Sequence, residues 1–484
     1  MSHPIPLIPF EERARKALGD QRLQQALKVA TTKFVVHRQE AMSLLPDADG
    51  LRQRGRAIRE RAIARLDEYL VQLESAVQAN GGHVHWAQNA EEACRVIVGL
   101  LRERRAQLVV KSKSMASEEI GLNHALQAAA IEAVETDLGE WIVQLAGETP
   151  SHIVAPAVHK TKEQVAELFE KQVNHPVDTD IPSLTKIARA QLREKFLAAD
   201  AAISGVNFAI AETGTLVLVT NEGNGRLAST LPRLHIAVMG LEKVIPTWDD
   251  LPILLTLLTR SATGQLITSY VTCITGPRRP GEADGPDELH LVILDNGRTR
   301  ILENEYRESL YCIRCGACAN ACPVYLKIGG HAYGGVYSGP IGAVLTPLLQ
   351  GMEHFSALPH ASSLCGACKD ACPVRIDLPR MLLALRAQEV EEKKPPVWER
   401  LLFRLYAWGT SHPLIYRLGA RLGGLLAQPF AREGWIGRLP VPIISRWTAQ
   451  RDFPAPALRP FHTRWHELER EVAPAHQQDE TQRG

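Results

Sequence analysis

The chain has 484 residues, of which 45% are hydrophobic and 23% charged, and its formal net charge is +1. This length exceeds that of one hydrophobic core and predicts about three domains. The near-neutral charge gives no global signal for nucleic-acid binding. The N-terminal segment becomes charged at Glu11, before an apolar signal core could form, and no apolar run reaches the roughly 18 residues of a membrane helix. Nine cysteines without an export signal therefore predict metal or redox chemistry in the cytoplasm.

The chain divides into four predicted regions. Residues 1–80 are predicted to form an N-terminal helical arm, because polar helical patterns continue there without a strand signal. In residues 81–298, short β-rich runs alternate with helical ones, which is typical of an α/β domain with a largely parallel sheet. The predicted strands are Leu108–Val110, Ile131–Val134, His152–Val154, Thr215–Thr220, His235–Met239, Ser269–Ile274 and Leu289–Leu294.

The third region, residues 299–394, begins with a predicted helix over Thr299–Leu310 and then holds seven of the nine cysteines. The fourth, residues 395–484, is a C-terminal region whose last ten residues are predicted to be disordered. Within it, residues 397–452 carry eight arginines against three acidic residues, a net charge of +5, interleaved with tryptophans and leucines. Such a segment can lie on an anionic membrane, dock a partner or pack on its own chain. Its repeated prolines and glycines favour packing or partner docking.

The first cysteine motif has the spacing C-x2-C-x2-C-x3-C-P, which is typical of bacterial [4Fe–4S] proteins. Its members are Cys312, Cys315, Cys318, Cys322 and Pro323. Three thiolates at this spacing wrap a turn around one cube, and a glycine after the second of them lets the backbone approach the cluster sulfides. The longer step directs the fourth thiolate away from that cube, and in two-cluster ferredoxins it serves the other cluster.

The second motif lacks the leading cysteine, and Ser362 stands in its place. Its members are Cys365, Cys368, Cys372 and Pro373. The exchange rule assigns four cysteines to cluster 1 and three to cluster 2. Cluster 1 takes Cys312, Cys315, Cys318 and Cys372; cluster 2 takes Cys322, Cys365 and Cys368. Cluster 2 is then a [4Fe–4S] cube with a non-cysteine ligand or a [3Fe–4S] cluster, and the ligand candidates are Ser362, Ser363, His360 and His331.

A zinc site is the alternative interpretation of these cysteines. Zinc sites use paired C-x2-C knuckles, which do not explain a three-residue step that ends in Cys-Pro twice. The spacing therefore favours two iron–sulfur clusters, most simply [4Fe–4S]. The two remaining cysteines, Cys94 and Cys273, each lie alone in an apolar run and are predicted to be small buried hydrophobes.

Three segments of the α/β region are candidates for ligand binding. Val110–Ser114 follows a strand and opens a helix, so its two lysines and two hydroxyls form either an anion site or an ordinary helix cap with solvated lysines. Glu212 lies in a turn that enters a strand and is a candidate to point into a cleft. The loop Asn221–Arg226 is rich in Gly and Asn and either binds a ligand or is a flexible turn. No Rossmann, P-loop or esterase motif is present.

Together, these segments resemble the B-protein family of the bacterial lactate-utilisation systems. The stretches that carry the resemblance are Ser204–Arg226, Leu231–Pro246, Gly285–Arg298, Cys312–Pro347 and Ser362–Val374. The glycine-rich linker GGHAYGGVYSGPIGAVLTP, which joins the two motifs, is more specific than the cysteine spacing itself. The resemblance covers roughly residues 10–470 and keeps the order of the family's parts.

The resemblance implies a lactate-utilisation (LUD) type α/β domain, similar in fold to ribose-5-phosphate isomerase and CoA transferases, followed by a helical ferredoxin module with two clusters. It also implies two partner proteins, the A- and C-type subunits, with which the chain oxidises L-lactate to pyruvate for growth on lactate. The leading hypothesis is therefore an electron-transfer subunit. The alternative is a stand-alone α/β enzyme with isomerase- or transferase-like chemistry and structural or sensory clusters, but no activated nucleophile or acid–base pair in the sequence supports it.

Overall fold

A sheet of six parallel strands forms the centre of the structure, a computed structural model that describes residues 8–393, 396–437, 448, 451–465, 467 and 469. In the order in which they lie across the sheet, the strands are β1 (His83–Ala87), β10 (Glu288–Leu294), β7 (Leu234–Gly240), β4 (Ala201–Gly205), β2 (Leu108–Lys111) and β3 (Glu132–Glu135). Every neighbouring pair is parallel. The predicted α/β class is thus confirmed.

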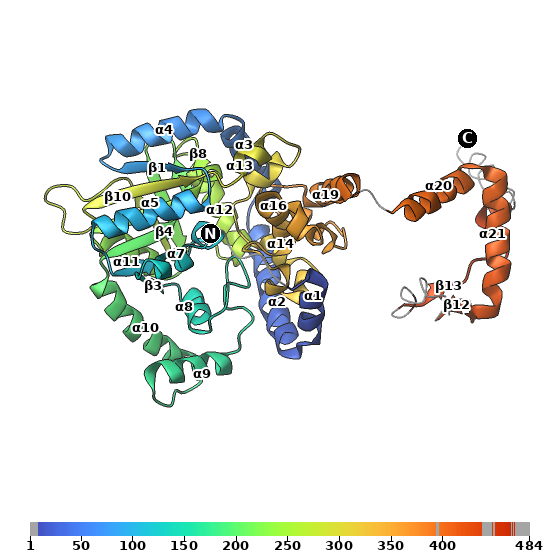
Figure 1. Cartoon of the computed structure of the whole chain (residues 1–484), viewed down its shortest axis with the longest axis horizontal. Helices are drawn as coiled ribbons and strands as arrows, with labels where there is room; N and C mark the ends of the chain where they lie inside the picture. The colour runs from blue at the N-terminus through green and yellow to red at the C-terminus, as the bar shows by residue number, and fades with distance from the viewer. Residues whose placement is uncertain are drawn as a thin grey trace, which may run out of the picture. The chain divides into compact units, whose positions relative to one another are not determined.

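Both faces of this sheet are covered, as its nearly continuous apolar strands require. Successive side chains of β10 belong alternately to two hydrophobic cores, with Leu291 and Ile293 in one and Val292 and Leu294 in the other. The first core includes the apolar side of α4 (Leu66–Ala79), and the second includes α5 (Ala90–Glu103) and α7 (Leu122–Ala128). Figure 1 shows α4 and α5 on opposite sides of β1 and β10.

The other helices of this part surround the sheet. They are α6 (Met115–Glu119), α8 (Leu138–Leu145), α9 (Lys162–Val173), α10 (Ile181–Ala198), α11 (Asn224–Thr230), α12 (Asp250–Ala262) and α13 (Arg298–Leu302). Trp141 of α8, Phe169 of α9 and Phe196 of α10 form a third core that joins these helices to the β2–β4 part of the sheet.

A second, four-stranded mixed sheet contains two of the predicted strands. Its order is β8 (Val244–Ile245), β5 (Phe208–Ile210), β6 (Thr215–Thr220) and β9 (Tyr270–Ile274), and β6 pairs with β9 antiparallel. The side chain of Cys273 on the edge strand β9 is exposed because the inward positions there belong to Thr272 and Ile274, so the prediction of a buried thiol is wrong. Cys94 on α5 is buried as predicted.

The predicted strand His152–Val154 is wrong. These residues form a series of bends that lie against the ferredoxin module, and they do not join a sheet. The Tyr325 hydroxyl donates to the Ser151 carbonyl at 2.9 Å, and a His152 ring nitrogen lies 3.1 Å from Asn320 Oδ1. These backbone and side-chain contacts with residues far along the chain replace the hydrogen bonds that a strand would need.

Four N-terminal helices precede the sheet, namely α1 (Phe10–Gly19), α2 (Gln21–Ser43), α3 (Ala48–Ala64) and α4. Arginine side chains of these helices also donate hydrogen bonds to backbone carbonyls of the cysteine-containing region. Arg13 Nε donates to Ala332 O at 3.0 Å, and Arg38 Nη2 donates to Ala371 O at 2.9 Å. Figure 1 shows α1 and α2 beside α14.

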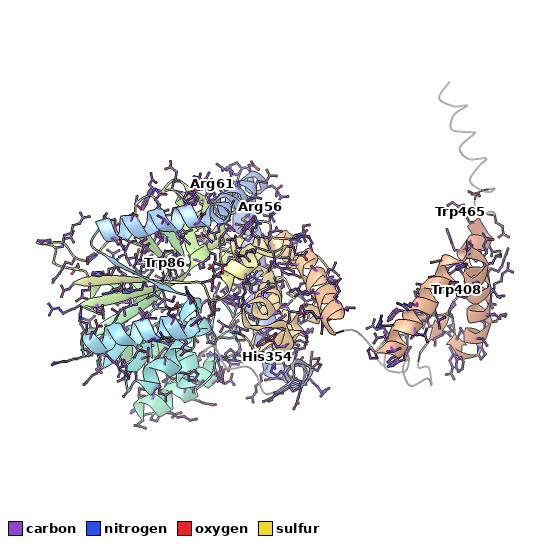
Figure 2. All side chains as sticks on the ribbon, turned by 45° about the horizontal axis from the view of Figure 1, so that its top comes forward. Arg56, Arg61, Trp86, His354, Trp408 and Trp465 are labelled. Atoms are coloured by element: carbon purple, nitrogen blue, oxygen red, sulfur yellow. The ribbon has the colours of Figure 1, made fainter. Side chains whose placement is uncertain are left out.

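Helix α3 joins the sheet part to the cysteine-containing region. Arg56 forms an ion pair with Glu308 at 2.5 Å, and Arg61 forms one with Asp250 of α12 at 2.8 Å. Figure 2 shows both arginines on the same helix. Arg59 between them is buried and donates to the backbone carbonyls of the two regions. The helix therefore connects both regions through side chains from consecutive turns.

The cysteine-containing region is made of short helices. They are η2 (Arg307–Tyr311), α14 (Ala317–Asn320), α15 (Tyr325–Ile328), η3 (His331–Tyr333), α16 (Gly339–Gln350), α17 (Met352–Phe355), η4 (Leu358–His360), α18 (Ala367–Ala371) and α19 (Leu378–Lys393). The predicted continuous helix over Thr299–Leu310 is wrong, because α13 and η2 are separate. Asn304 lies between them, and its side-chain oxygen accepts the Tyr306 N–H at 2.9 Å, which competes with helix continuation.

By its internal contacts the chain divides into the units Met1–Glu389 and Val390–Gly484. The second unit contains α20 (Val397–Ser411), α21 (Pro413–Ala427), η5 (Gln428–Phe430) and the short strands β11 (Ala431–Arg432), β12 (Trp435–Ile436) and β13 (Phe453–Pro454). Many large apolar side chains of α20 and α21 are exposed. Among the described residues, no helix combines the length and the hydrophobicity that crossing a membrane needs. The ten C-terminal residues predicted to be disordered lie outside the described residues.

Candidate functional site

The two cysteine motifs fold into the same local structure. Gly316 has φ of 74° directly before α14, and Gly366 has φ of 86° directly before α18. Two residues earlier, Arg314 and Leu364 also have positive φ, at 61° and 55°. Because positive φ is uncommon outside glycine, its repetition at equivalent positions shows that the second motif keeps the turn of the first. Ser362 therefore occupies the position of the missing cysteine in an otherwise conserved turn geometry.

The structure brings together the four cysteines that the exchange rule assigns to cluster 1. Cys312, Cys315, Cys318 and Cys372 line one small cavity with apolar side chains such as Ile153. Burial raises the pKa of Cys372 to about 11, with a further contribution from Cys312. Burial also raises the pKa of Cys315, and the next contributions come from Cys372 and Cys312. The thiols are close enough to influence one another's ionisation, as ligands of one cluster must be.

The three cysteines assigned to cluster 2 form a second group. Burial raises the pKa of Cys368 to about 12, and the next contribution is from Cys322. Cys365 is exposed, and its pKa is lowered by hydrogen bonds from the Ala367 N–H and the Ser363 hydroxyl. One thiol of this group therefore reaches the protein surface, whereas its other two members are buried.

The candidates for the non-cysteine ligand lie in different surroundings. The Ser363 hydroxyl contacts the Cys365 thiol, whereas Ser362 Oγ accepts the Leu364 N–H at 3.1 Å. His360 Nε2 lies 2.8 Å from Glu389 Oε2. Within the described part of the chain, Ser363 is thus the candidate whose side chain interacts with a cysteine of cluster 2.

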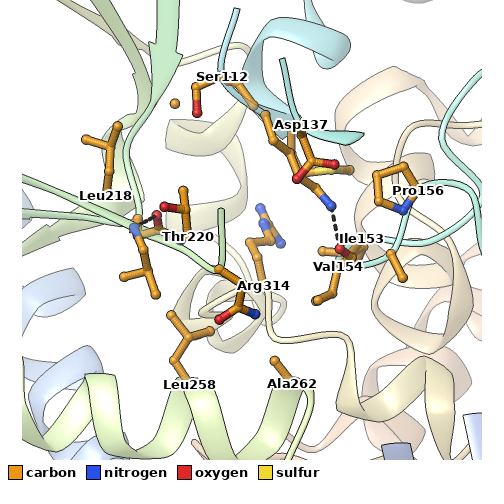
Figure 3. A pocket seen from close by; sticks show the side chains of 18 of the residues that line it. Ser112, Asp137, Ile153, Val154, Pro156, Leu218, Thr220, Leu258, Ala262 and Arg314 are labelled. Carbon is orange, nitrogen blue, oxygen red and sulfur yellow. Dashed lines mark hydrogen bonds between the residues drawn. The ribbon is translucent and has the colours of Figure 1, made fainter. Parts of the chain in front are cut away.

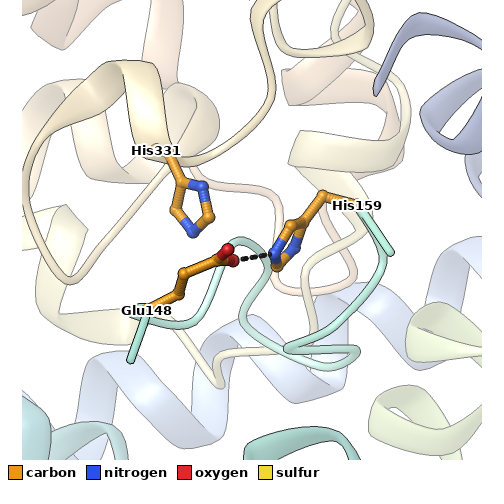
Figure 4. Close-up of side chains that lie close together, drawn as sticks. All are labelled: Glu148, His159 and His331. Carbon is orange, nitrogen blue, oxygen red and sulfur yellow. Dashed lines mark hydrogen bonds and ion pairs between the residues drawn. The ribbon is translucent and has the colours of Figure 1, made fainter. Parts of the chain in front are cut away.

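His331, the remaining candidate, belongs to a separate polar group with Glu148 and His159 (Figure 4). Its Nε2 donates to the Thr149 carbonyl at 2.6 Å, while His159 Nε2 lies 2.7 Å from Glu148 Oε2. Burial lowers the pKa of His159 to about 4, so this ring is neutral at pH 7. These contacts fasten the loop after α8 to η3 and occupy the Nε2 atom of His331.

A residue that the sequence did not single out lies at the cysteines. The Tyr333 side chain is completely buried, and its hydroxyl has no hydrogen-bond partner among the described residues. Burial raises its pKa, and the next contributions include the thiolates of Cys322, Cys318 and Cys368. The hydroxyl thus lies among cysteines of both groups. A buried unpaired hydroxyl is costly, so this one fits a donor to an iron–sulfur cluster. The glycine-rich linker that contains Tyr333 was the available signal.

Other donors fit clusters held by these cysteines. The backbone N–H of Arg314 donates to Cys312 Sγ at 3.4 Å, and the backbone N–H of Ile376 donates to Cys372 Sγ at 3.3 Å. The buried Arg38 Nε has no partner among the described residues, and its side chain is within electrostatic reach of Cys315 and Cys372. N–H donors and a cation beside the thiolates stabilise the negative charge of a cluster, so the donor set fits the predicted cofactor.

We expect Tyr333→Phe to shift the midpoint potential of cluster 2 to a more negative value while leaving the iron content unchanged. The substitution removes one hydroxyl donor, and hydrogen bonds to cluster sulfurs raise the reduction potential. A redox titration followed by EPR measures both clusters. Tyr406→Phe is the matched control because Tyr406 is exposed on α20. An unchanged titration curve for the Tyr333 variant would contradict the assigned role.

A cavity of about 570 Å³ opens where the parallel strands end at their carboxyl termini (Figure 3). Residues from five strand ends line it: Ser112 after β2, Asp137 after β3, Asn207 after β4, Lys243 after β7 and Arg298 after β10. Arg314 and Tyr337 of the ferredoxin module complete the wall. In open α/β sheets, ligands bind outside the carboxyl ends of strands, so this cavity is the candidate ligand site.

Two of the three segments that the sequence suggested reach this cavity. Lys113 and the loop residues Asn221 and Glu222 line it. Lys111, however, is not a solvated or ligand-binding lysine, because its ammonium is buried in an ion pair with Glu135 at 2.5 Å. Ser114 caps α6 by accepting the Ser117 N–H at 3.1 Å, which agrees with the helix-cap alternative.

Glu212, the third candidate, does not line the cavity. Its carboxylate accepts the Trp248 N–H at 2.9 Å and stabilises a turn. Within the cavity wall, burial and the nearby Asp137 raise the pKa of Glu222 to about 7. Burial lowers the pKa of Lys243 to about 8, with a further effect of Arg314. The sequence did not single out Lys243, because a lysine after a strand is common.

The wall next to cluster 1 is a buried ion network. Arg298 donates to both carboxylate oxygens of Glu119 at 2.8 Å and to Glu242 Oε2 at 2.5 Å. Arg314 Nη2 donates to Glu242 Oε1 at 3.1 Å. A Cβ atom at Gly240, the last residue of β7, would lie 2.5 Å from Arg298 Nε, so the strand has to end in glycine for this network to form.

Comparisons with known proteins agree with this organisation. Three family models match: the LUD domain over residues 70–294, the 4Fe-4S dicluster domain over 308–376, and the C-terminal domain of lactate utilisation protein B over 386–470. A solved structure of a DUF162 family protein from Deinococcus radiodurans is 16% identical and covers 47% of this chain and 98% of its own, but its TM-score of 0.26 is too low to carry an argument.

Relatives similar over nearly their whole length bear one name, lactate utilization protein B. The protein of Shouchella clausii is 47% identical over 95% of this chain and 97% of its own, and that of Bacillus licheniformis is 47% identical over 94% and 96%. The protein of Bacillus subtilis is 46% identical over 94% of this chain and 95% of its own. With its LUD domain and its 4Fe-4S dicluster domain in the same order, the chain belongs to the lactate utilisation protein B family.

Proposed function

We propose that the chain is the electron-transfer subunit of a three-protein complex that oxidises L-lactate to pyruvate, with the A- and C-type lactate-utilisation proteins as partners. The observation that carries the proposal is the arrangement of the seven cysteines in two groups around α14. Cys318 lies within α14 and belongs to the first group, and Cys322 lies two residues beyond its end and belongs to the second. Two redox centres held this close suit a relay.

The chemistry requires such a relay because conversion of L-lactate to pyruvate releases two electrons and two protons. Two iron–sulfur clusters held by these cysteines supply two one-electron carriers. The positions of the two cysteine groups suggest the direction of electron transfer. The first group adjoins the large cavity through Arg314, which borders both, whereas the second group reaches the surface at Cys365. Electrons would enter on the cavity side and leave near the exposed thiol. The described geometry offers no specific support for the alternative of a stand-alone isomerase- or transferase-like enzyme.

Reconstitution tests this function. We expect L-lactate to bleach the visible absorption of the clusters when the anaerobic protein is mixed with both partner proteins, because the clusters then receive the substrate's electrons. Leaving out either partner should abolish the bleaching. Dithionite added to each mixture provides the control for clusters that are intact but receive no electrons. Clusters that stay oxidised in the complete mixture, yet respond to dithionite, would contradict the proposal.

The C-terminal unit is proposed to contribute to assembly. On α20 and α21 the side chains of Leu402, Trp408 and Leu418 are all more than half exposed, and arginines lie between such apolar positions. Of the surfaces that this composition fits, the docking of a partner subunit is favoured over an anionic membrane. Helix α20 ends at Ser411 and Pro413 begins α21, so the segment forms two short helices and not one long amphipathic helix.

Removal of residues 397–484 should therefore abolish co-purification with the partner proteins and leave the iron content of the remaining chain unchanged. The expected loss follows from removing the exposed apolar surface. Pull-down under anaerobic, low-salt conditions and iron analysis measure the two effects. Flotation with liposomes that contain anionic lipids tests the membrane alternative. Salt-sensitive flotation of the intact chain, lost on truncation, would contradict partner docking.

A further inference from the structure

We propose that the cavity at the carboxyl ends of the strands binds a small aliphatic 2-hydroxy acid, whose carboxylate is held by the Lys243 ammonium and the Arg314 guanidinium. The inference rests on the proposed role in lactate oxidation and assigns substrate binding to this chain rather than to a partner. It concerns binding and the position of the acid beside cluster 1.

Cationic side chains with unused hydrogen-bond donors lie at the end of the cavity that would hold the ligand carboxylate. Arg314 is 8% exposed, and its Nη1 has no hydrogen-bond partner among the described residues. The guanidinium is held in place by Glu242, and it lies 4.5 Å from the centroid of the Tyr337 ring. Figure 3 shows it pointing into the cavity. Lys243 lines the same cavity, and within the described part of the chain its ammonium makes no hydrogen bond or ion pair. Two cationic side chains therefore lie in the cavity wall.

When the cysteine thiolates are left aside, the side-chain charges that border this end of the cavity do not balance. Three cationic side chains, Lys243, Arg298 and Arg314, surround two buried carboxylates, Glu119 and Glu242. Arg298 already binds both carboxylates, and Arg314 binds the second oxygen of Glu242. Burying a charge without a partner is costly. A ligand carboxylate would offset the remaining positive charge and would accept from donors that are already in place, with geometry fixed by the surrounding ion pairs.

A competing role for these cations is to offset only the charge of cluster 1. The Cys312 thiolate contributes to the electrostatics of both Lys243 and Arg314. This role requires no cavity, however, whereas the donors line a space of about 570 Å³, within the roughly 300–1,000 Å³ typical of small-molecule sites. The experiment below separates the two roles.

The rest of the cavity fits the other end of an aliphatic 2-hydroxy acid. Leu218, Leu258 and Ala262 provide apolar walls for an alkyl group. Asn207 Oδ1 accepts the Val219 N–H at 2.8 Å, which leaves the Asn207 amide group available to donate to a ligand hydroxyl. Because the cavity exceeds the size of a three-carbon acid, we expect it to accept longer alkyl chains as well as L-lactate.

Binding is tested on the anaerobic, cluster-loaded full-length protein by calorimetry with 2-hydroxyisobutyrate. This 2-hydroxy acid has no hydrogen on C2, so it cannot be oxidised to a 2-oxo acid during the measurement. We expect one site per chain and no binding of the neutral amide analogue. Lys243→Gln should weaken the affinity about tenfold or more, because it removes a charge-assisted hydrogen bond. Lys243→Arg should restore most of the affinity.

The matched control is Lys186→Gln, which changes an exposed lysine on α10 outside the cavity and should leave the affinity unchanged. The absence of binding to the wild-type protein, or equal affinity of Lys243→Gln, overturns the inference and leaves charge compensation of the cluster as the role of these cations. If Lys243→Gln loses iron, EPR of the reduced wild-type protein decides. Saturating 2-hydroxyisobutyrate should shift the signal of cluster 1 alone, since Arg314 also donates its N–H to Cys312 Sγ. An unchanged spectrum overturns the inference.

This result is independent of the reconstitution described above. Lactate-dependent reduction of the clusters without binding of the acid to this chain would overturn the binding site and leave the electron-transfer function intact. Binding without reduction in the complete three-protein mixture would leave the binding site intact and overturn the electron-transfer function.

Discussion

Cys315→Ser should lower the iron content of the anaerobically purified protein from about eight atoms per chain to about four. If cluster 2 is of the [3Fe–4S] type, the values are about seven and about three. Cys315 is buried in the group of four thiols, and a serine hydroxyl is a poor substitute for thiolate as a ligand of iron. Iron analysis gives the stoichiometry. EPR should retain the signal of cluster 2, in the reduced sample for a [4Fe–4S] cluster and in the oxidised sample for a [3Fe–4S] cluster.

The matched control is Cys94→Ser. Cys94 is also buried, but it lies on α5, and its thiol donates to the Ile120 carbonyl at 3.4 Å, a hydrogen bond that a hydroxyl can replace. Its iron content should equal that of the wild type. Zinc in stoichiometric amount, or loss of all iron from the Cys315 variant together with a wild-type content of only four, would contradict two independent clusters.

The iron–sulfur module was the most predictable part of this chain. Its turns are local structures, so the positive φ of Gly316 and Gly366 follows from residues next to them in the sequence. The exchange of Cys322 and Cys372 between the groups is a long-range feature, yet the C-P spacing predicts it. In the structure Cys312, Cys315, Cys318 and Cys372 line one cavity, and the assignment of each thiol to a cluster stays a prediction.

The sheet was less predictable because its strands differ in how they are buried. β6 and β10 have apolar runs that are visible in the sequence, whereas β1 (His83–Ala87) contains two histidines and β4 (Ala201–Gly205) is short and rich in alanine. Burial of β4 between β7 and β2 determines its conformation, which local propensity does not. The assignment of β6 to a second, mixed sheet likewise depends on pairing with β9 across about 50 residues.

The cavity and its ion network could not be predicted from local patterns. Glu119, Glu242, Arg298 and Arg314 are separated by long stretches of chain, and each is an ordinary charged residue in its own segment. Only the convergence of the strand ends on the ferredoxin module makes them neighbours. The same argument applies to Tyr333, whose environment depends on the folding of both cysteine motifs around the linker.

Arg298→Met should be among the most destabilising single substitutions in this chain. The side chain is completely buried, and the change leaves Glu119 and Glu242 without their shared cation. Breaking a buried ion pair by removing one partner costs about 3–5 kcal/mol. The free energy of unfolding, measured by urea denaturation of the cluster-loaded protein, should fall by about this amount.

The pH dependence of this loss identifies its cause. In the wild type, burial acts to raise the pKa of Glu242, but Arg298 and Arg314 hold it at about 2. Because this value lies below that of an unfolded glutamate, the stabilisation is complete above about pH 5 and does not change between pH 5 and 8. In the variant, Glu242 keeps its ion pair with Arg314, whereas Glu119 loses Arg298, its cationic partner. Burial then raises the folded-state pKa of Glu119 above the unfolded value, so protonation of Glu119 favours the folded state. The deficit should therefore shrink as the pH falls from 8 to 5.

Arg104→Met provides the matched control for geometry. Arg104 also binds a carboxylate with two hydrogen bonds of 2.8 Å, to Glu288, but this pair lies at the surface in contact with solvent. The free energy of unfolding should fall much less in this variant, because water replaces both partners and exposed ion pairs contribute little. This smaller loss should also be the same at pH 5 and 8. Equal losses for the two variants would show that burial is not what makes the Arg298 network important.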